Sequence, residues 1–453
     1  MKVDLVIRGG SVVTEIGIAN LDLAVHEGKI VTIGQFNNSI SGDREINARG
    51  LVVLPGLVDP HVHFREPGPN EEEDFYTGTR AAAAGGITTI LEQPVDSPPT
   101  TTVKRFNEKM QIAKERCVVD YGLWGGVIPD NLNDIYGLSQ AGACAFKAFI
   151  CSSDPIYPMV NDGVMLDAMR RVATLNKMIA VHAENQGIVE HYTAIYNAPD
   201  RVKGSDYVTS RPAIAEIEAI QRMILFAKLT KVHLHILHLS EGEGATLIEK
   251  VQKDGQNVTV ETCPHYLILS NESMDVYGPY AKCNPPLREK ANQEKLWRAL
   301  KNGTIGCLVS DHSPYTSADK DRGLEDVRLA PPGINGLELG LPLMVSEGVH
   351  TGKATFNDLA MWMSANPAKL MGVYPQKGHI SIGADADFAL VDPKKKWEVM
   401  PEKLETKNKW SPYAGWQLHG KVIQTILRGE TVYQEGAFLK GAGYGQFVPS
   451  HMP

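Results

Sequence analysis

The sequence predicts an α/β fold in which a (β/α)8 barrel carries a small β-sandwich domain formed by both chain ends. The middle of the chain alternates apolar strand patterns with amphipathic helical patterns, as a parallel barrel requires. The start and the end of the chain show strand-like alternation with glycine-containing turns between the strands. We therefore expect the sandwich domain in residues 1–53 and 375–453, and the barrel in residues 54–374.

Eight strand patterns follow one another through the predicted barrel. They are Leu51–Val58, Ile87–Glu92, Val118–Val127, Ala145–Ile150, Met178–Glu184, Val232–Ser240, Asn257–Cys263 and Gly306–Asp311. Helical patterns between them include Asp74–Ala84, Val103–Glu115, Gly163–Asn176, Ile214–Leu229 and Gly244–Lys253. In such a barrel the carboxyl ends of all strands meet at one mouth, where active sites lie. Polar residues at these strand ends are therefore the first candidates for chemistry.

Composition narrows the class of protein. The 453 residues are 43% hydrophobic and 22% charged, which is typical of a globular protein. A net charge of −8 argues against a nucleic-acid partner. The six cysteines form no CxxC pair, which favours reduced thiols and a cytoplasmic location. The chain shows neither a signal-peptide pattern nor a membrane span, so we expect no membrane partner.

Four histidines and an aspartate stand at the predicted strand ends. His61 and His63 follow the first strand, and residues two apart in a strand face the same side. His182 lies in "IAVHAEN", His238 in "HILHLS" and Asp311 in "LVSDHSP". Each one alone could be an ordinary structural residue, and Asp311 could cap a turn. Their coincidence at convergent strand ends predicts a metal site.

Lys147 adds a further expectation because it stands among Phe146, Ala148 and Phe149. An isolated buried ammonium is costly, and neighbouring metal ions would make it costlier. The lysine could extend out of the barrel instead. If CO2 adds to the neutral amine, however, the carbamate is an anionic ligand whose two oxygens can bridge two metal ions. Zinc accepts nitrogen and oxygen ligands, and paired metal ions activate water near neutral pH. Asp311 could ligate a metal and transfer a proton to a leaving nitrogen. These residues predict metal-assisted hydrolysis of a carbonyl compound, an amide in particular.

A family resemblance accompanies these residues. Seven segments resemble motifs of the cyclic amidohydrolases of the amidohydrolase superfamily and occur in the same order. They are "VDPHVHFREPG", "FKAF", "VHAEN", "HLS", "ETCPHYL", "KCNPPLR" and "SDHSP". That group includes allantoinases, hydantoinases, dihydropyrimidinases and dihydroorotases. The resemblance implies a homotetramer that acts on a small cyclic amide or ureide, with two Zn²⁺ per subunit. By motif, His61, His63, N6-carboxylated Lys147 and Asp311 would hold the first zinc, and the same carbamate with His182 and His238 would hold the second.

The motifs "CPHYL", "KCNPPLR" and "SDHSP" are most like those of allantoinases, which convert allantoin and water to allantoate. "SPPTTT" and "YPQKG" are similar to microbial L-hydantoinases, the main alternative. D-hydantoinases and dihydropyrimidinases carry a tyrosine five residues after the carboxylated lysine, where this chain has Ser152. "PVD" departs from the "PLN" usual in allantoinases.

Two charged residues bear on the choice of substrate. Arg65 stands where dihydroorotases bind the substrate carboxylate, but Asp96 stands near their asparagine. We expect Asp96 to repel a second carboxylate and to accept hydrogen bonds from ureido N–H groups, which favours allantoin. Alternatively, Arg65 forms a structural salt bridge with Asp96 or Glu92.

Other residues are predicted with less defined roles. Ser152, Asn284 and the backbone of Gly333 are expected to contact substrate, whereas Asn335 could serve either substrate or a turn. His265 is expected to pack in the core, with a supporting position behind the metal ligands as the alternative, and His233 and His235 are expected to face away from the mouth. Two rival functions are an inactive scaffold relative, which typically lacks several metal ligands, and a phosphotriesterase-like hydrolase that uses the same metals.

Overall fold

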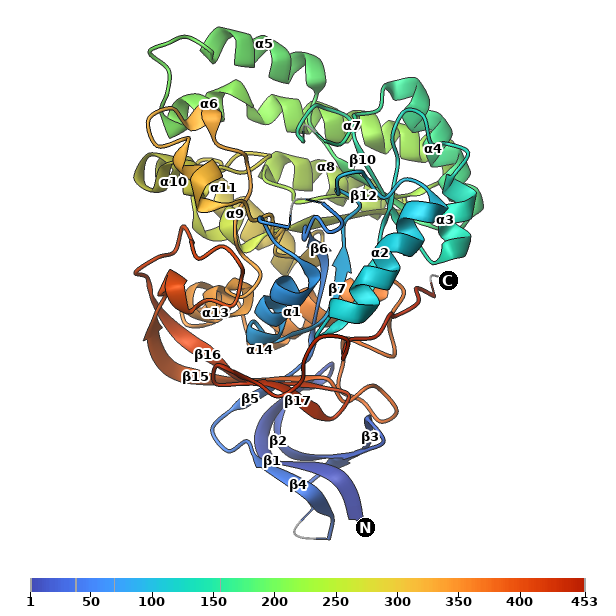
Figure 1. Cartoon of the computed structure of the whole chain (residues 1–453), viewed down its shortest axis with the longest axis vertical. Helices are drawn as coiled ribbons and strands as arrows, with labels where there is room; N and C mark the ends of the chain where they lie inside the picture. The colour runs from blue at the N-terminus through green and yellow to red at the C-terminus, as the bar shows by residue number, and fades with distance from the viewer. Residues whose placement is uncertain (1, 37–38, 69, 155, 452–453) are drawn as a thin grey trace.

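The computed structural model describes residues 2–36, 39–68, 70–154, 156–451 of the chain. A helix-rich barrel region forms the upper part of Figure 1, and a β-rich region with the N-terminus forms the lower part. This arrangement confirms the predicted α/β class. In the described part, no helix combines the length and the apolar character that a membrane crossing needs. All six cysteines are free and buried.

Parallel strands form the barrel in the predicted order. They are β6 (Leu57–Val62), β7 (Ile87–Glu92), β8 (Asp120–Leu123), β9 (Gly125–Gly126), β10 (Phe146–Phe149), β11 (Met178–His182), β12 (His233–Ile236), β13 (Val258–Thr262) and β14 (Cys307–Leu308). A three-stranded sheet contains β6 to β8, and a six-stranded sheet contains β9 to β14. Val62 pairs in parallel with His312, and His63 N–H donates to His312 O at 2.8 Å, which joins the first strand to the end of the last.

The first barrel strand begins later than predicted. Val52–Pro55 (β5) pairs with β1 and β15 in the terminal sheet, and β6 starts only at Leu57. Gly56 separates the two strands, and a Cβ there would lie 2.2 Å from Thr88 Oγ1. A side chain does not fit at this change of sheet. The shift also places His61 inside β6 rather than beyond its end.

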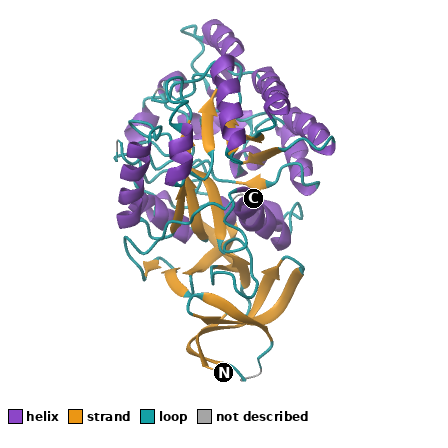
Figure 2. Ribbon diagram, turned by 90° about the vertical axis from the view of Figure 1, so that its right-hand side faces the viewer, coloured by secondary structure: helices purple, strands orange, loops and turns teal. Residues whose placement is uncertain are grey.

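Helices surround and extend the barrel (Figure 2). They are α1 (Phe75–Ala84), α2 (Val103–Arg116), α3 (Ile135–Ala141), α4 (Asp162–Thr174), α5 (Gln186–Tyr196), α6 (Gly204–Ser210), α7 (Ala213–Thr230), α8 (Gly242–Lys253), α9 (Pro264–Ile268), α10 (Asn271–Tyr277), α11 (Lys290–Lys301), α12 (Ser317–Asp321), α13 (Gly340–Met344), α14 (Phe356–Ala360) and α15 (Asn366–Leu370) among the described residues. The helices α1, α2, α4, α7 and α8 match the five predicted helical segments within two residues at each end. The sequence analysis did not predict α5 and α6, the two helices between β11 and α7.

Both chain ends build one nine-stranded sheet. Its strands are β1 (Lys2–Thr14), β2 (Gly17–His26), β3 (Lys29–Gly34), β4 (Ser41–Asn47), β5 (Val52–Pro55), β15 (Phe388–Glu398), β16 (Gln417–Leu427), β17 (Glu430–Gln434) and β18 (Ala437–Phe438). Leu5 and Leu23 share a buried cluster with Phe388, Leu390 and Ile426, so residues from the two ends pack together. The strands form one continuous hydrogen-bonded sheet, and the exact domain boundaries stay a prediction.

A buried ion cluster joins the barrel to this sheet. Lys377 Nζ lies 2.5 Å from Asp120 Oδ2, 2.9 Å from Asp385 Oδ2 and 2.8 Å from Asp387 Oδ2. Asp120 begins β8, whereas Asp385 and Asp387 precede β15. Arg428 also pairs with Asp120. The ammonium of Lys377 thus offsets carboxylates from both parts of the molecule.

Replacing Lys377 by methionine should destabilise the protein, because three buried carboxylates lose a cation. We expect the free energy of unfolding to fall by about 3–5 kcal/mol, measured by urea denaturation. The matched control is Lys253→Met, which removes an exposed pair with Glu249 on α8. Its cost should be at most about 0.5 kcal/mol. Equal denaturation midpoints for the two variants would contradict this account.

Candidate functional site

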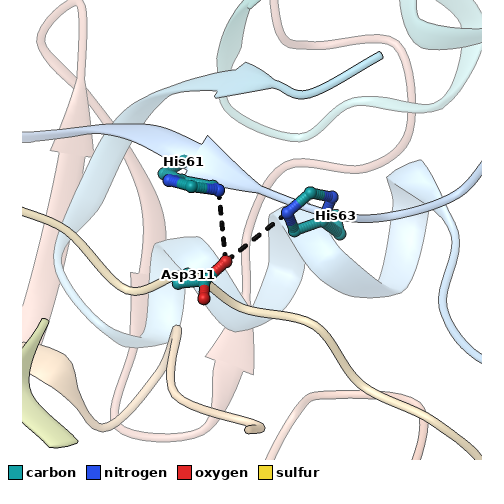
Figure 3. Close-up of side chains that lie close together, drawn as sticks. All are labelled: His61, His63 and Asp311. Atoms are coloured by element: carbon teal, nitrogen blue, oxygen red, sulfur yellow. Dashed lines mark ion pairs between the residues drawn. The ribbon is translucent and has the colours of Figure 1, made fainter. Parts of the chain in front are cut away.

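Three of the predicted metal ligands meet at the carboxyl end of the barrel. His61 Nε2 lies 3.2 Å from Asp311 Oδ1, and His63 Nε2 lies 3.4 Å from the same oxygen. Figure 3 shows both imidazoles pointing toward this carboxylate from β6 and the residue after it. One potential ligand atom from each residue lies within 4.8 Å of the others. These three side chains could bind one cation together.

Lys147 joins the same cluster from β10. Its side chain is buried, and its Nζ lies 3.3 Å from His61 Nε2. Burial lowers the pKa of Lys147 to about 8, although Asp311 and Glu261 favour the charged form. The amine is therefore neutral more often than an exposed lysine, and the neutral amine is the form that reacts with CO2.

His182 and His238 form the other half of the cluster. His182 ends β11, His238 follows β12, and His182 Nδ1 lies 3.0 Å from His238 Nε2. Burial lowers the pKa of both rings, which keeps them neutral. A neutral imidazole has a lone pair that can bind a metal ion. Two such rings facing each other can share a cation.

Two glutamates that the sequence analysis missed determine which ring nitrogens are free. Glu261 on β13 contacts His61 Nδ1, and Glu184 Oε2 lies 2.7 Å from His182 Nε2. A carboxylate accepts the ring proton, so the lone pair is left on the opposite nitrogen. His61 Nε2 and His182 Nδ1 are the nitrogens that face the cluster. The ring nitrogens that face the cluster are therefore free to bind a pair of metal ions.

Arg211 supports the second of these carboxylates, with its Nε 3.0 Å from Glu184 Oε1. Burial opposes ionisation of Glu184, but Arg211 and the hydrogen bond from His182 hold its pKa well below the usual range. Two features of the sequence could have indicated these glutamates. Glu261 is the single charged residue of the strand pattern "VTVETC", and Glu184 follows His182 by two positions.

The backbone is unusual at three site residues. Arg65, His238 and Asp311 adopt φ angles of 57°, 35° and 45°. Residues other than glycine seldom occupy this left-handed region, and when they do they often lie at functional sites. The conformation turns each side chain from the end of its strand toward the barrel mouth.

A pocket opens above the histidine cluster. It is lined by His63, Lys147, His182, His238, Asp311, Arg65, Asn284 and Gly333 among the predicted residues, and by Val95, Phe149, Ser153, Asp154, Cys283, Ser313, Tyr315 and Pro332 in addition. A larger cavity of about 650 Å³ between α1, α13 and the terminal sheet contains none of these residues. The small pocket is therefore the candidate active site.

Arg65 does not pair with Asp96 or Glu92, the alternative considered from the sequence. Its Nε lies 2.9 Å from Glu72 Oε2, and its Nη1 lies 3.1 Å from Asp154 Oδ2. Its Nη2 also donates to Tyr315 Oη at 2.7 Å. Two carboxylates thus balance the guanidinium at the pocket wall.

The structure does not support the predicted substrate contact of Asp96. This carboxylate is buried outside the pocket lining and lies 2.8 Å from Lys109 Nζ, which also contacts Glu92. Lys109 on α2 offsets its charge, so in this structure the carboxylate is paired within the protein and its role in substrate choice stays a prediction. Ser152 likewise lies on the surface, where its N–H donates to Gln186 Oε1 at 2.7 Å, and its neighbour Ser153 lines the pocket instead.

Three further residues discussed from the sequence lie outside the pocket lining. Asn335 Nδ2 donates to the carbonyls of Asn408 and Trp410, each at 3.0 Å, so its side chain joins this loop to a distant segment. His265 is buried, as expected. His235 Nε2 lies 3.1 Å from Glu261 Oε2, so this ring supports the carboxylate behind His61.

The comparisons with known proteins agree with this geometry. The Amidohydrolase family model matches residues 52–432. An allantoinase from Enterococcus faecalis is 40% identical, and the alignment covers 99% of this chain and 100% of the relative. An L-hydantoinase from Paenarthrobacter aurescens is 37% identical over 98% of both chains. The solved structure titled "L-Hydantoinase (Dihydropyrimidinase) from Arthrobacter aurescens" superposes with a TM-score of 0.96, at 36% identity over 99% of this chain and 100% of that one.

The barrel and its site define a hydrolase that acts on carbon–nitrogen bonds in cyclic amides. The chain belongs to the amidohydrolase family. The prediction of an enzyme is therefore confirmed, and the inactive-scaffold alternative is set aside.

Glu261→Gln should weaken metal binding, because the amide no longer fixes the His61 tautomer as a carboxylate does. We expect the zinc affinity to fall about 10- to 100-fold, measured by competition with a chelator. Glu272→Gln, a change on the exposed face of α10, is the matched control and should bind zinc like the parent protein. Unchanged affinity in Glu261→Gln would show that this hydrogen bond does not orient the ring.

Proposed function

We propose that the protein is an allantoinase with a binuclear zinc centre, which hydrolyses the cyclic amide bond of allantoin to give allantoate. The observation that carries the proposal is the convergence of four imidazoles, one aspartate and one buried lysine in one cluster beside a single pocket. The allantoinases among the full-length relatives support the choice of allantoin.

The proposed ligands follow from the ring nitrogens that face the cluster. His61, His63 and Asp311 would hold one zinc ion, His182 and His238 the other, and carboxylated Lys147 would bridge them. When bound, the zinc pair supplies a hydroxide nucleophile near neutral pH. Burial lowers the pKa of His63, His182 and His238, which favours such binding because no proton has to leave these three rings.

Asp311 is the proposed catalytic residue for proton transfer. It accepts the proton of the attacking water as the carbon–oxygen bond forms and delivers it to the ring nitrogen as the carbon–nitrogen bond breaks. Its position in the pocket lining, next to both His61 and His63, suits this role. The left-handed backbone at Asp311 keeps the carboxylate aimed at the cluster.

Asn284 is the proposed group that orients the ring. Tyr207 Oη donates to Asn284 Oδ1, and Asn284 Nδ2 donates to Ser153 Oγ at 3.1 Å. These bonds define which end of the amide carries the protons, and an amide nitrogen has a second hydrogen available. That hydrogen can bind a ring carbonyl, while the backbone of Gly333 lines the same pocket.

The charges at the pocket favour a neutral substrate. Arg65 is balanced by Glu72 and Asp154, so it is not a free partner for a substrate carboxylate such as that of dihydroorotate. The neutral polar groups of Ser153 and Ser313 suit a ureido substituent. L-hydantoinase is the second candidate, favoured by the near-complete superposition on an L-hydantoinase structure.

A substrate panel tests the assignment. Zinc-loaded protein is assayed with racemic allantoin, hydantoin, 5-substituted hydantoins, dihydrouracil and dihydroorotate, with products followed by chromatography. We expect the highest kcat/KM for allantoin. A preference for an L-5-aryl hydantoin would favour the second candidate, and a preference for dihydroorotate would contradict the account of Arg65.

Reconstitution tests the carboxylated lysine. Metal-free protein should regain activity and bind two zinc ions per chain when zinc is added with bicarbonate, and far less in CO2-free buffer. Lys147→Met should lose the zinc pair and at least about 1,000-fold in kcat, which corresponds to about 4 kcal/mol in barrier height. Lys253→Met serves as the control with normal activity. Full reconstitution without CO2 would rule the carbamate out.

A further inference from the structure

Two buried lysines near the pocket differ from the other buried lysines. The buried lysines of the described chain are Lys109, Lys147, Lys282, Lys320 and Lys377. Lys109 and Lys377 contact carboxylates, and Lys147 lies in the histidine cluster. Within the described ranges, Lys282 and Lys320 form no ion pair and donate to backbone carbonyls instead. Burying a charge without a counter-ion is costly, so these two residues call for an explanation.

Lys282 holds one segment of backbone behind the pocket. Its Nζ lies 3.0 Å from Val327 O, 3.3 Å from Arg328 O and 2.5 Å from Ala330 O. These three carbonyls match the three donors of an ammonium group. The backbone of Lys282 contributes as well, because its carbonyl accepts from Gly333 N–H at 2.8 Å.

Lys320 holds the same segment from the other side. Its Nζ donates to Pro331 O at 3.0 Å and reaches Lys282 O at 3.5 Å. Between them, the two ammonium groups hold most of the carbonyls between residues 327 and 331. The next two residues, Pro332 and Gly333, line the active-site pocket. We call residues 327–333 the wall segment.

Both ammonium groups also lie over aromatic rings that support pocket residues. Lys282 Nζ is 4.4 Å from the ring centre of Tyr207, whose hydroxyl donates to Asn284. Lys320 Nζ is 5.1 Å from a ring centre of Trp410, whose Nε1 donates to Tyr315 O at 2.8 Å. Contacts of this kind attract a cation to the ring face. The two lysines thus connect the wall segment to both Asn284 and Tyr315.

We propose that Lys282 and Lys320 are positioning residues that shape the pocket wall and thereby set the preference among substituents at carbon 5 of the substrate ring. The ammonium groups keep the wall segment and Asn284 at fixed positions although neither lysine lines the pocket. The proposal rests on the proposed function only for the choice of allantoin as a probe. Activity on cyclic amides, which the family membership establishes, is sufficient for its test.

Kinetics with two substrates test this role. Lys282→Met and Lys320→Met are assayed with allantoin and with hydantoin, which lacks the substituent at carbon 5. We expect KM for allantoin to rise about tenfold, and the ratio of kcat/KM between the two substrates to change at least about fivefold. The zinc content should stay that of the parent protein, since neither lysine contacts the histidine cluster.

The matched control is Lys377→Met, which removes an equally buried lysine between the barrel and the terminal sheet. It should lower stability and leave KM and the substrate ratio unchanged. If Lys282→Met and Lys320→Met also lower stability with the same KM and the same ratio, the lysines are structural only and the proposal is wrong.

A conservative variant keeps the test valid if the methionine variants do not fold. Lys282→Gln retains two N–H donors. It should change the ratio of kcat/KM between the two substrates less than complete loss of the donors does. Amide hydrogen exchange in residues 327–333 should be faster than in the parent protein. Parent-like kinetics together with parent-like exchange in this variant would overturn the proposal. If allantoin is not hydrolysed, the best ring of the substrate panel replaces it, so failure of the allantoinase assignment is seen separately.

Discussion

The hydrogen bonds from His61 to Glu261 and from His182 to Glu184 are the interactions on which the site depends. Each carboxylate accepts one ring proton and so leaves the opposite nitrogen free toward the pocket. Without them either tautomer would be available, and the lone pairs would not reliably face one another. Both glutamates are buried, and neighbouring groups favour their ionised form. Arg211 and His182 lower the pKa of Glu184, and His61 and His235 lower the pKa of Glu261.

Several buried charges are matched by ion pairs close to them. Lys377 neutralises aspartates at the junction with the terminal sheet, and Lys109 neutralises Asp96 below the pocket. Arg65 is likewise balanced by Glu72 and Asp154 at the pocket wall. A pocket whose charged walls are already paired offers little to a charged substrate, and this suits an uncharged ring that is opened by hydrolysis.

The barrel strands hold the candidate metal ligands directly, but they do not hold the residues proposed to contact substrate in the same way. The candidate metal ligands lie on or next to strands, whose positions the barrel hydrogen bonds define. Asn284 and Gly333 belong to loops, and their positions depend on Tyr207, Lys282 and the wall segment. Relatives that match this chain over nearly its full length can therefore differ in substrate, as the allantoinase and hydantoinase relatives do by name.

The sequence alone determined the barrel, the β-rich end domain and the cluster at the strand ends, because these follow from local periodicity. The carboxyl ends of the parallel strands meet at one mouth of the barrel, regardless of how the loops between them fold. Only the tertiary structure decided the partners of Arg65 and Asp96 and the contacts of Glu261 and Lys282. Glu261 is separated from His61 by 200 positions in the chain. Such contacts depend on how loops and helices pack, and no short sequence pattern encodes that packing.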